Sequence, residues 1–429
     1  MNSRTRVAVV GIVVAALVTL GSLEYVWLSL NRPGGGNQGN PAVELAPVQT
    51  GLAFPVALAF ASDGRIFFAE RNTGNIRILE NGAVLPTPFY TLANTATAGE
   101  RGLLGLALDP AFPSSPWVYA YQTYNDAANG TIYNRIVRIQ ASGDTGLSHS
   151  VILRMPPLSG ATNHNGGVIA FGPDGKLYAV VGENANPSLA QDPMSLLGKV
   201  LRMNPDGSAP PDNPFTGNLS WDNRIYTYGH RNMFGLTFHP ITGRGYVTEN
   251  GPACNDEVNL LAQGRNYGWG PTATCATPPL PPSNTNRDGP NPVLPIDWWT
   301  PPTAPTNAAF YTGSLLPQSR NDLMFGAYNV HRLRELKLSA ADGASVVSET
   351  ILATAPDAIL DVEMGRDGYL WVTTPRAIYR LVASPTVMNG MELMTWTSVL
   401  AVAVSERKLE APGSCVCPVS QLRGPSQKP

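Results

Sequence analysis

The stretch GVIAFGPDGKLYAVVGEN, residues 167–184, contains the pattern that decides how this chain folds. A short apolar run leads into a polar turn at Asp174-Gly175, and a second run rich in aromatic and β-branched residues follows. Asp-Gly supplies the positive φ that a two-residue hairpin turn requires. The stretch therefore predicts a β-hairpin.

Five further segments repeat this plan of strand, turn and strand. They begin at Val56, Gly105, Gly235, Leu316 and Ile359, with Asp-Gly turns at Asp63-Gly64 and Asp367-Gly368 in two of them. Most are followed by another strand of mixed basic and apolar residues, and the body of the chain lacks long helical periodicity. Repeated units of about four short strands are typical of a propeller. The sequence therefore predicts an all-β fold, a six-bladed β-propeller of four-stranded antiparallel blades.

The ends of the chain differ in character from this body. Residues 1–30 carry Arg4 and Arg6 before an uncharged apolar run, which predicts a signal peptide or an N-terminal membrane anchor with the remainder exported. No clean small-x-small cleavage site follows the run, which favours an anchor on the outer face of the cytoplasmic membrane. A cleaved leader would instead give a periplasmic or extracellular protein.

Three more regions follow the leader. Residues 31–43 form a Gly/Pro-rich linker that cannot pack a core, and residues 44–385 form the propeller. Residues 386–429 form a C-terminal tail to which the sequence assigns no role.

Charge is sparse in this chain. Only 14% of residues are charged, the net charge is −2, and no basic stripe is present. This composition argues against nucleic acid as a partner and fits a small polar ligand better. Membrane contact is expected through the N-terminal segment only.

The four cysteines fit an exported chain. Cys254 and Cys275 flank a short loop-rich segment and are expected to form a disulfide in an oxidising compartment. Cys415 and Cys417 are too close in sequence to bridge each other without strain. Intermolecular pairing, a metal or no role at all remain open for that pair.

Four longer segments carry a resemblance to a known family. They are GERGLLGLALDPAF, HNGGVIAFGPDGKLYAVVGEN, AQDPMSLLGKVLRMNPDGSAPPDNPF and YGHRNMFGLTFHPITGRGYVTENGPACNDEVNLLAQGRNYGWG, all within Val56–Leu381. They resemble the glucose/sorbosone dehydrogenase family, the soluble PQQ-dependent aldose sugar dehydrogenases. Several long motifs in the family's order are more specific than one short motif. The family's six-bladed propeller agrees with the count of repeats.

The resemblance implies roles for five side chains. His164 matches the general base that takes the proton of the anomeric hydroxyl while hydride passes to the C5 carbonyl of PQQ, a step suited to an imidazole. Glu183, across the hairpin, matches its acidic partner. Arg231 and Asn232 match the pair that contacts the quinone, where the arginine stabilises developing negative charge. Glu100 falls where sugar-oxidising members often carry a substrate-binding glutamine.

The resemblance also implies calcium. Gly251 and Pro252 match positions whose backbone carbonyls hold the ion that polarises PQQ, and carbonyl oxygens are suitable calcium ligands. Asp256, Glu257 and Tyr267 resemble residues around a further, structural calcium in some members.

Three positions depart from the family pattern. The family anchors the carboxylates of PQQ with a lysine and two arginines, and the alignment places Asn329, Ala358 and Leu360 there. A dense anion binds less well without cationic partners. His331, on the strand face of Asn329, or Arg332 could compensate in part.

Three functions therefore compete. The first is an exported PQQ- and calcium-dependent dehydrogenase that oxidises an aldose or related sugar aldehyde and passes electrons to an external acceptor. The second is a binding propeller that keeps the fold and has lost its cofactor, supported by Asn329, Ala358 and Leu360. Separately, Arg231 and Glu257 could form only a structural ion pair. The third is a calcium-dependent lactonase. A propeller fold by itself does not choose among them.

Overall fold

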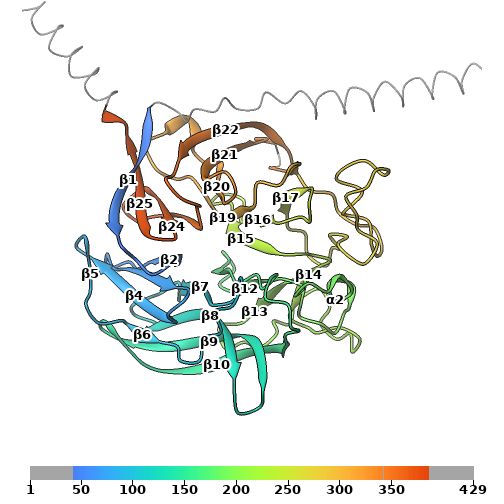
Figure 1. The fold of residues 1–429 in the computed structure, drawn as a ribbon, viewed down its shortest axis with the longest axis horizontal. Coiled ribbons are helices and arrows are strands. Elements are labelled where there is room, and N and C mark those ends of the chain that lie inside the picture. The colour runs from blue at the N-terminus through green and yellow to red at the C-terminus, as the bar shows by residue number, and fades with distance from the viewer. Residues whose placement is uncertain (1–41, 342, 386–429) are drawn as a thin grey trace, which may run out of the picture. The chain divides into compact units, whose positions relative to one another are not determined.

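The computed structural model describes residues 42–341 and 343–385. Within these residues, six antiparallel sheets are arranged around a common centre as a six-bladed β-propeller (Figure 1). The predicted fold class is confirmed.

The first three blades are each built from strands that are consecutive in the chain. Blade 1 contains β2 (Pro55–Phe60), β3 (Ile66–Glu70), β4 (Asn75–Glu80) and β5 (Ala83–Val84), with β6 (Tyr90–Thr91) also paired to β4. Blade 2 contains β7 (Leu103–Leu108), β8 (Trp117–Asp126), β9 (Thr131–Ser142) and β10 (Thr145–Pro157). Blade 3 contains β11 (Ile169–Phe171), β12 (Leu177–Val181), β13 (Lys199–Met203) and β14 (Ile225–Tyr228).

The next two blades follow the same rule. Blade 4 contains β15 (Met233–Phe238), β16 (Gly245–Glu249), β17 (Asp256–Leu260) and β18 (Asp297–Trp299). Blade 5 contains β19 (Pro305–Phe310), β20 (Leu323–Ala327), β21 (Arg332–Leu338) and β22 (Val346–Thr354). The two short helices of the described chain, α2 (Pro187–Gln191) and the 3-10 helix η1 (Pro317–Ser319), lie in connecting segments.

Blade 6 closes the ring with strands from both ends of the propeller. It combines β23 (Asp361–Met364), β24 (Leu370–Thr374) and β25 (Ala377–Ala383) with β1 (Val43–Thr50) as its outer strand. Val43 pairs with Ala383, so the first and last strands of the propeller are hydrogen-bonded to each other. The sequence repeats did not reveal this pairing, because β1 has no hairpin partner beside it in the chain.

The Asp-Gly turns have one geometry, which differs in detail from the expected two-residue turn. In blade 3, the backbone N–H of Gly172 donates to Lys176 O, so the loop has three residues. Gly175 has a φ of 70°, and Asp174 Oδ1 accepts from the N–H of Lys176. A three-residue loop with its last residue in the left-handed region is also a common hairpin connection. The same bonds recur at Asp63-Gly64 and Asp367-Gly368.

The fifth repeat begins elsewhere than predicted. The segment from Leu316 forms a turn with η1, and the first strand of blade 5 is β19, upstream of it. That strand, PTNAAF, starts with proline and is rich in small residues, which have weak β-propensity. The number of blades is unaffected.

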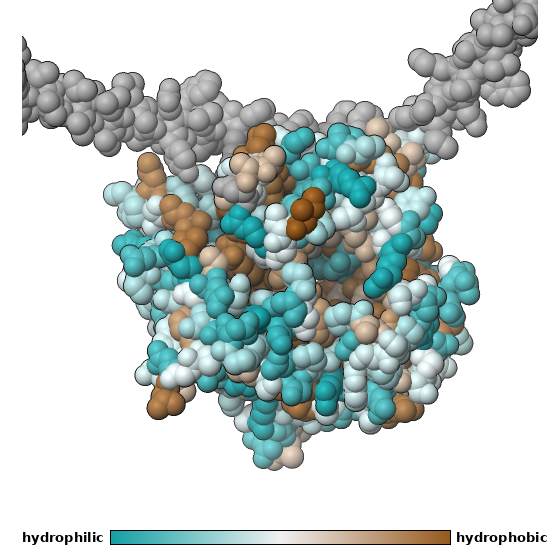
Figure 2. Space-filling view, turned by 180° about the vertical axis from the view of Figure 1, so that it is seen from behind, coloured by the Kyte–Doolittle hydropathy of each residue, from teal (hydrophilic) through white to brown (hydrophobic). Residues whose placement is uncertain are grey.

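The core lies between neighbouring blades. Between blades 2 and 3, for example, the fully buried rings of Tyr119 and Tyr121 pack in one cluster with Leu177 and Leu201. The outer surface mixes hydrophilic and hydrophobic side chains (Figure 2). Among the described residues, no helix is long and apolar enough to cross a membrane. The expected leader at 1–30 and the tail with Cys415 and Cys417 lie outside the described residues.

Candidate active site

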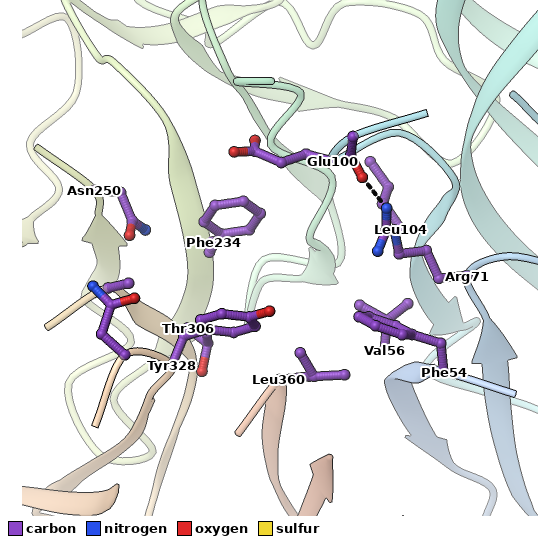
Figure 3. Close-up of a pocket in the computed structure, with 13 residues that line it drawn as sticks. Phe54, Val56, Arg71, Glu100, Leu104, Phe234, Asn250, Thr306, Tyr328 and Leu360 are labelled. Atoms are coloured by element: carbon purple, nitrogen blue, oxygen red, sulfur yellow. Dashed lines mark hydrogen bonds between the residues drawn. The ribbon is translucent and has the colours of Figure 1, made fainter. Parts of the chain in front are cut away.

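A cavity of about 380 Å³ lies where the innermost strands of the blades converge (Figure 3). Its size falls within the usual range for small-molecule sites, about 300–1,000 Å³. Its lining residues come from five blades and their loops: Phe54, Val56, Arg71, Gly99, Glu100, Leu104, Phe234, Asn250, Ala304, Thr306, Tyr328, Asn329 and Leu360. Glu100 and Asn250 connect this cavity to a cluster of hydrogen-bonded charged side chains.

His164 is at the centre of that cluster. Its Nδ1 lies 2.7 Å from Glu183 Oε1, and its backbone N–H donates to Glu100 Oε2 at 2.7 Å. A carboxylate can only accept, so Nδ1 carries the proton and Nε2 presents its lone pair. His164 has a φ of 57°, a conformation that costs a non-glycine residue about 1–3 kcal/mol and recurs at functional sites.

The hairpin of blade 3 brings Glu183 to His164. Strand β12 returns antiparallel to β11, with Ile169 paired to Ala179. Gly182 lies so close to the loop that an added Cβ would be 2.3 Å from His164 O, so only glycine fits there. Glu183 itself is fully buried.

Asn232 and Arg231 join the cluster from the entry to blade 4. Asn232 Nδ2 donates to Glu100 Oε2 at 3.1 Å, and its Oδ1 accepts from the N–H of Gly166 at 3.2 Å. Arg231 Nη1 donates to Asn250 O at 2.8 Å. Burial lowers the pKa of Arg231, although nearby carboxylates, Glu183 foremost, oppose this shift. The residues Glu100, His164, Glu183, Arg231 and Asn232 are hereafter the histidine cluster.

A second histidine–glutamate pair supports this cluster, and the sequence analysis missed it. His230 Nδ1 lies 2.8 Å from Glu249 Oε2, with the same separation of 19 residues as His164 and Glu183. Glu249 Oε1 also accepts from the N–H of Arg231 at 2.5 Å. His230 is fully buried and stacks on Tyr267, so it acts as a structural support. The repeated spacing was the available signal.

Three of the five positions expected to hold calcium line a second, much smaller cavity of about 10 Å³, whereas Asp256 and Tyr267 do not. Gly251, Pro252, Glu249 and Glu257 are among its lining residues. A space of this size accommodates about one water molecule, and oxygen donors suit a hard cation such as calcium. The donor set near Gly251 therefore fits a calcium ion. Within the described chain, no group of three or more His, Cys, Asp or Glu residues is placed to hold a metal by itself.

Asp256 has a different set of contacts. Its Oδ1 accepts from the N–H of Gly251 at 2.8 Å, and its Oδ2 accepts from the N–H of Ala304 at 2.6 Å. Burial raises its pKa. Asp256 thereby ties the Gly251 turn to the start of blade 5.

Glu257 and Tyr267 are brought together by an asparagine. Asn286 Nδ2 donates to Glu257 Oε2 at 3.1 Å and to Tyr267 O at 3.0 Å. Burial, reinforced by the nearby Glu249 carboxylate, raises the pKa of Glu257 to about 8. Asn286 was not identified from sequence, because it lies in a proline-rich insertion without a motif.

A disulfide holds this insertion. Cys254 and Cys275 are bonded as expected, with their Cα atoms 5.8 Å apart. Next to it, Asn255 Nδ2 donates to Asn284 Oδ1 at 2.6 Å, which fixes the far end of the insertion beside blade 4.

The wall opposite the histidine cluster is apolar. We call Phe54, Val56, Tyr328 and Leu360, from blades 1, 5 and 6, the apolar wall. Leu360 lines the cavity and is 8% exposed, while Ala358 is buried and does not line it. Asn329 lies at the exposed rim.

These residues do not fit PQQ with its three carboxylates. His331 and Arg332, the expected substitutes for the missing cations, are not among the lining residues of the cavity. Each charge-assisted hydrogen bond contributes about 1.5–3 kcal/mol, so three missing cations remove most of the expected affinity.

Comparison with known proteins gives consistent matches. The sequence model of the glucose / sorbosone dehydrogenase family matches residues 52–382. An aldose sugar dehydrogenase of Escherichia coli (strain K12) is 31% identical over 340 residues, which cover 77% of this chain and 90% of that protein.

Solved structures agree. One from Thermus thermophilus, described as a candidate oxidoreductase (glucose dehydrogenase), is 36% identical with a TM-score of 0.70 and covers 79% of this chain and 100% of its own. The PQQ-bound form of an aldose sugar dehydrogenase from Streptomyces coelicolor is 29% identical with a TM-score of 0.66, covering 82% of this chain and 100% of its own.

Proposed function

Because the chain belongs to the glucose/sorbosone dehydrogenase family, we propose that it is a dehydrogenase that oxidises the anomeric hydroxyl of an aldose or a related sugar aldehyde. The observation that carries this proposal is the 2.7 Å contact between His164 Nδ1 and Glu183 Oε1. A histidine oriented in this way by a buried carboxylate is the usual form of a general base.

His164 takes the hydroxyl proton on Nε2. Glu183 holds the ring through Nδ1 and stabilises the imidazolium that forms, because a negative charge next to a new positive charge is favourable. Glu100, which lines the cavity and contacts the N–H of His164, orients the sugar hydroxyls. Arg231 does not line the cavity itself but donates to the backbone oxygen of Asn250, which does, and from there its charge can stabilise negative charge on the acceptor.

Calcium would be held by the carbonyl oxygens of Gly251 and Pro252. It would supply a positive charge near Arg231 and stiffen the turn before β17. Glu257 and Tyr267 are the second calcium position that the resemblance implies, and Asn286 links their oxygens. The Streptomyces relative was solved in a PQQ-bound form, and the apolar wall argues against PQQ as the acceptor in this chain.

The test is oxidation of a panel of aldoses by the purified full-length chain with an artificial dye, with and without PQQ and calcium. Formation of the lactone or aldonic acid is measured directly. His149→Ala serves as the control, because His149 lies on β10 and contacts Tyr90, away from the histidine cluster. Absence of product under every condition would refute the proposal.

A binding propeller is the second candidate function, and the apolar wall favours it. Such a protein would bind a sugar in the cavity without oxidising it. The same assay separates the two, because calorimetric binding of an aldose without product formation would support the binding protein. No observation favours the lactonase.

We also propose that the chain is exported and attached to the membrane through residues 1–30. The disulfide between Cys254 and Cys275 supports an oxidising compartment. Fractionation of cells that express the full chain tests this proposal, and recovery of the protein in the cytosolic fraction would contradict it.

A further inference from the structure

The apolar wall faces the cavity without a cation. In Figure 3, Phe234 and Tyr328 lie on one side of the cavity and Val56 and Phe54 on the other, with Leu360 between them. None of these five side chains has a charge, so a carboxylate placed against them would lose its hydration and find no counter-ion on the wall itself. Burying an unpaired charge in this way is strongly unfavourable.

Arg71, the one cation among the lining residues, is already engaged. Its Nε donates to Arg101 O at 3.0 Å, its Nη2 donates to Gly99 O, and the guanidinium lies 4.7 Å from the centre of the Phe54 ring. Burial lowers its pKa. Arg71 therefore holds the loop that carries Glu100, and little of its donor capacity faces the cavity.

Glu100 adds a negative charge to the same cavity. Its Oε2 accepts from the N–H of His164 and from Asn232, both neutral donors. With Arg71 and Glu100 as the charged lining residues, the positive and negative charges balance. An anion entering the cavity would meet no excess positive charge.

The uncharged polar groups of the cavity can donate hydrogen bonds to the carbonyl oxygens of a ligand. Thr306 lines the cavity, but its hydroxyl oxygen is buried beside Gly326. Asn250 and Asn329 also line the cavity, where Asn250 Nδ2 donates to Pro305 O and Asn329 Nδ2 donates to Pro302 O. An amide nitrogen carries two N–H donors, so each side chain keeps one for a ligand. The rings of Phe54, Phe234 and Tyr328 can stack on a flat aromatic group.

We propose that the electron acceptor which enters this cavity is an uncharged quinone, a flat ring with carbonyl oxygens and no carboxylates. The proposal rests on the proposed sugar oxidation for its chemistry. The C–H bond of the sugar breaks, and its electron pair passes as hydride to the quinone. His164 takes the hydroxyl proton and then releases it to the reduced quinone, so that the products are a lactone and a hydroquinone.

The experiment measures binding, without sugar or turnover. Quenching of tryptophan fluorescence is titrated with menadione (2-methyl-1,4-naphthoquinone) and, separately, with PQQ in the presence of calcium. The wild-type chain is expected to bind menadione more tightly than PQQ by about tenfold or more, as expected from the loss of charge-assisted contacts. Tighter binding of PQQ by the wild type would overturn the proposal.

Two variants test whether the absence of cations in the lining causes the preference for menadione over PQQ. Leu360→Arg should shift the ratio of the two affinities towards PQQ by about tenfold or more, because it restores one charge-assisted contact. Asn329→Lys, at the exposed rim, should shift the ratio in the same direction and is the safer variant for folding. Leu219→Arg, at a residue that is 96% exposed, adds the same charge elsewhere and should leave the ratio unchanged.

A ratio that stays unchanged in a folded Asn329→Lys chain would contradict the role of charge. Failure of sugar oxidation with normal menadione binding would refute the proposed function alone, whereas sugar oxidation without menadione binding would refute this inference alone.

Discussion

The histidine cluster, which reaches the cavity through Glu100, and the apolar wall are built in opposite ways. In the histidine cluster, charged groups have short hydrogen bonds, such as the 2.7 Å contacts of His164 with Glu183 and Glu100. The apolar wall presents Leu360 and Tyr328, which have no charge to pair. Proton transfer and acceptor binding therefore depend on different residues of this site and can be altered independently.

The largest expected effect comes from removing the base of the histidine cluster. His164→Ala should lower kcat for sugar oxidation by about 10²–10⁴-fold, the usual contribution of a general base. Menadione affinity should stay within about twofold, because the apolar wall is intact. Steady-state kinetics and fluorescence titration provide the two measurements. A variant that retained most of its rate would show that His164 is not the base.

The next largest effect is expected from the Cys254–Cys275 disulfide, which holds the proline-rich insertion that contains Asn286. Replacing both Cys254 and Cys275 by alanine should lower the free energy of unfolding by about 3 kcal/mol, because the reduced chain has a freer unfolded state. Hydrogen exchange should increase in β17, next to the insertion, and remain unchanged in β23, next to Leu360. Equal increases in both strands would contradict a local role of the disulfide.

A smaller effect is expected from the second histidine–glutamate pair. Glu249 accepts from His230 and from the N–H of Arg231, so Glu249→Gln should displace Arg231. We expect kcat to fall about tenfold with little change in KM, because small displacements of a positioned group affect the chemical step. A rise in KM with unchanged kcat would instead assign Glu249 to substrate binding.

The two sides of the cavity also differ in how well the sequence predicted them. The six blades followed from repeated local hairpins, whereas the pairing of His164 with Glu183 was implied by the family resemblance, with one hairpin returning Glu183 beside His164. Closure by β1 and the support from Asn286 depend on contacts between distant segments that no local pattern encodes. His230 and Glu249 were predictable in principle, since they repeat the spacing of His164 and Glu183 in the next blade.

For the apolar wall, the alignment predicted some residues of the cavity lining and missed the orientation of others. Sequence comparison identified Leu360 and Asn329 as departures from the family pattern, and the structure places both on the cavity lining. The expected substitution by His331 or Arg332 was not found there, because alignment gives the position of a side chain along a strand and not the direction in which the loop before the strand turns.

A smaller effect still is expected from β23, the strand that directly follows Leu360 of the apolar wall. Asp361 and Glu363 share one face of β23, and Asn307 Nδ2 donates to Asp361 Oδ1 at 2.6 Å and to Glu363 Oε1 at 3.0 Å. Burial raises the pKa of Asp361 to about 6, and burial together with the Asp361 charge raises the pKa of Glu363. Arg366, which lines the same pocket as Glu363, donates instead to Phe60 O at 3.2 Å.

Because these pKa values are raised in the folded state, their contribution to stability is fully present below the unfolded pKa of about 4 and is lost as pH rises through the folded values. The free energy of unfolding should therefore start to fall above about pH 4 and continue to fall through about pH 6, the folded pKa of Asp361, in denaturant titrations. Glu363→Gln should make this fall shallower, because one of the two acids no longer ionises. The rate of sugar oxidation by the Glu363→Gln variant should stay unchanged, because it depends on the histidine cluster. An equally steep fall in the variant would contradict this account. It would show that Glu363 is already ionised in the folded chain and that its contacts stabilise the charged and neutral carboxyl equally.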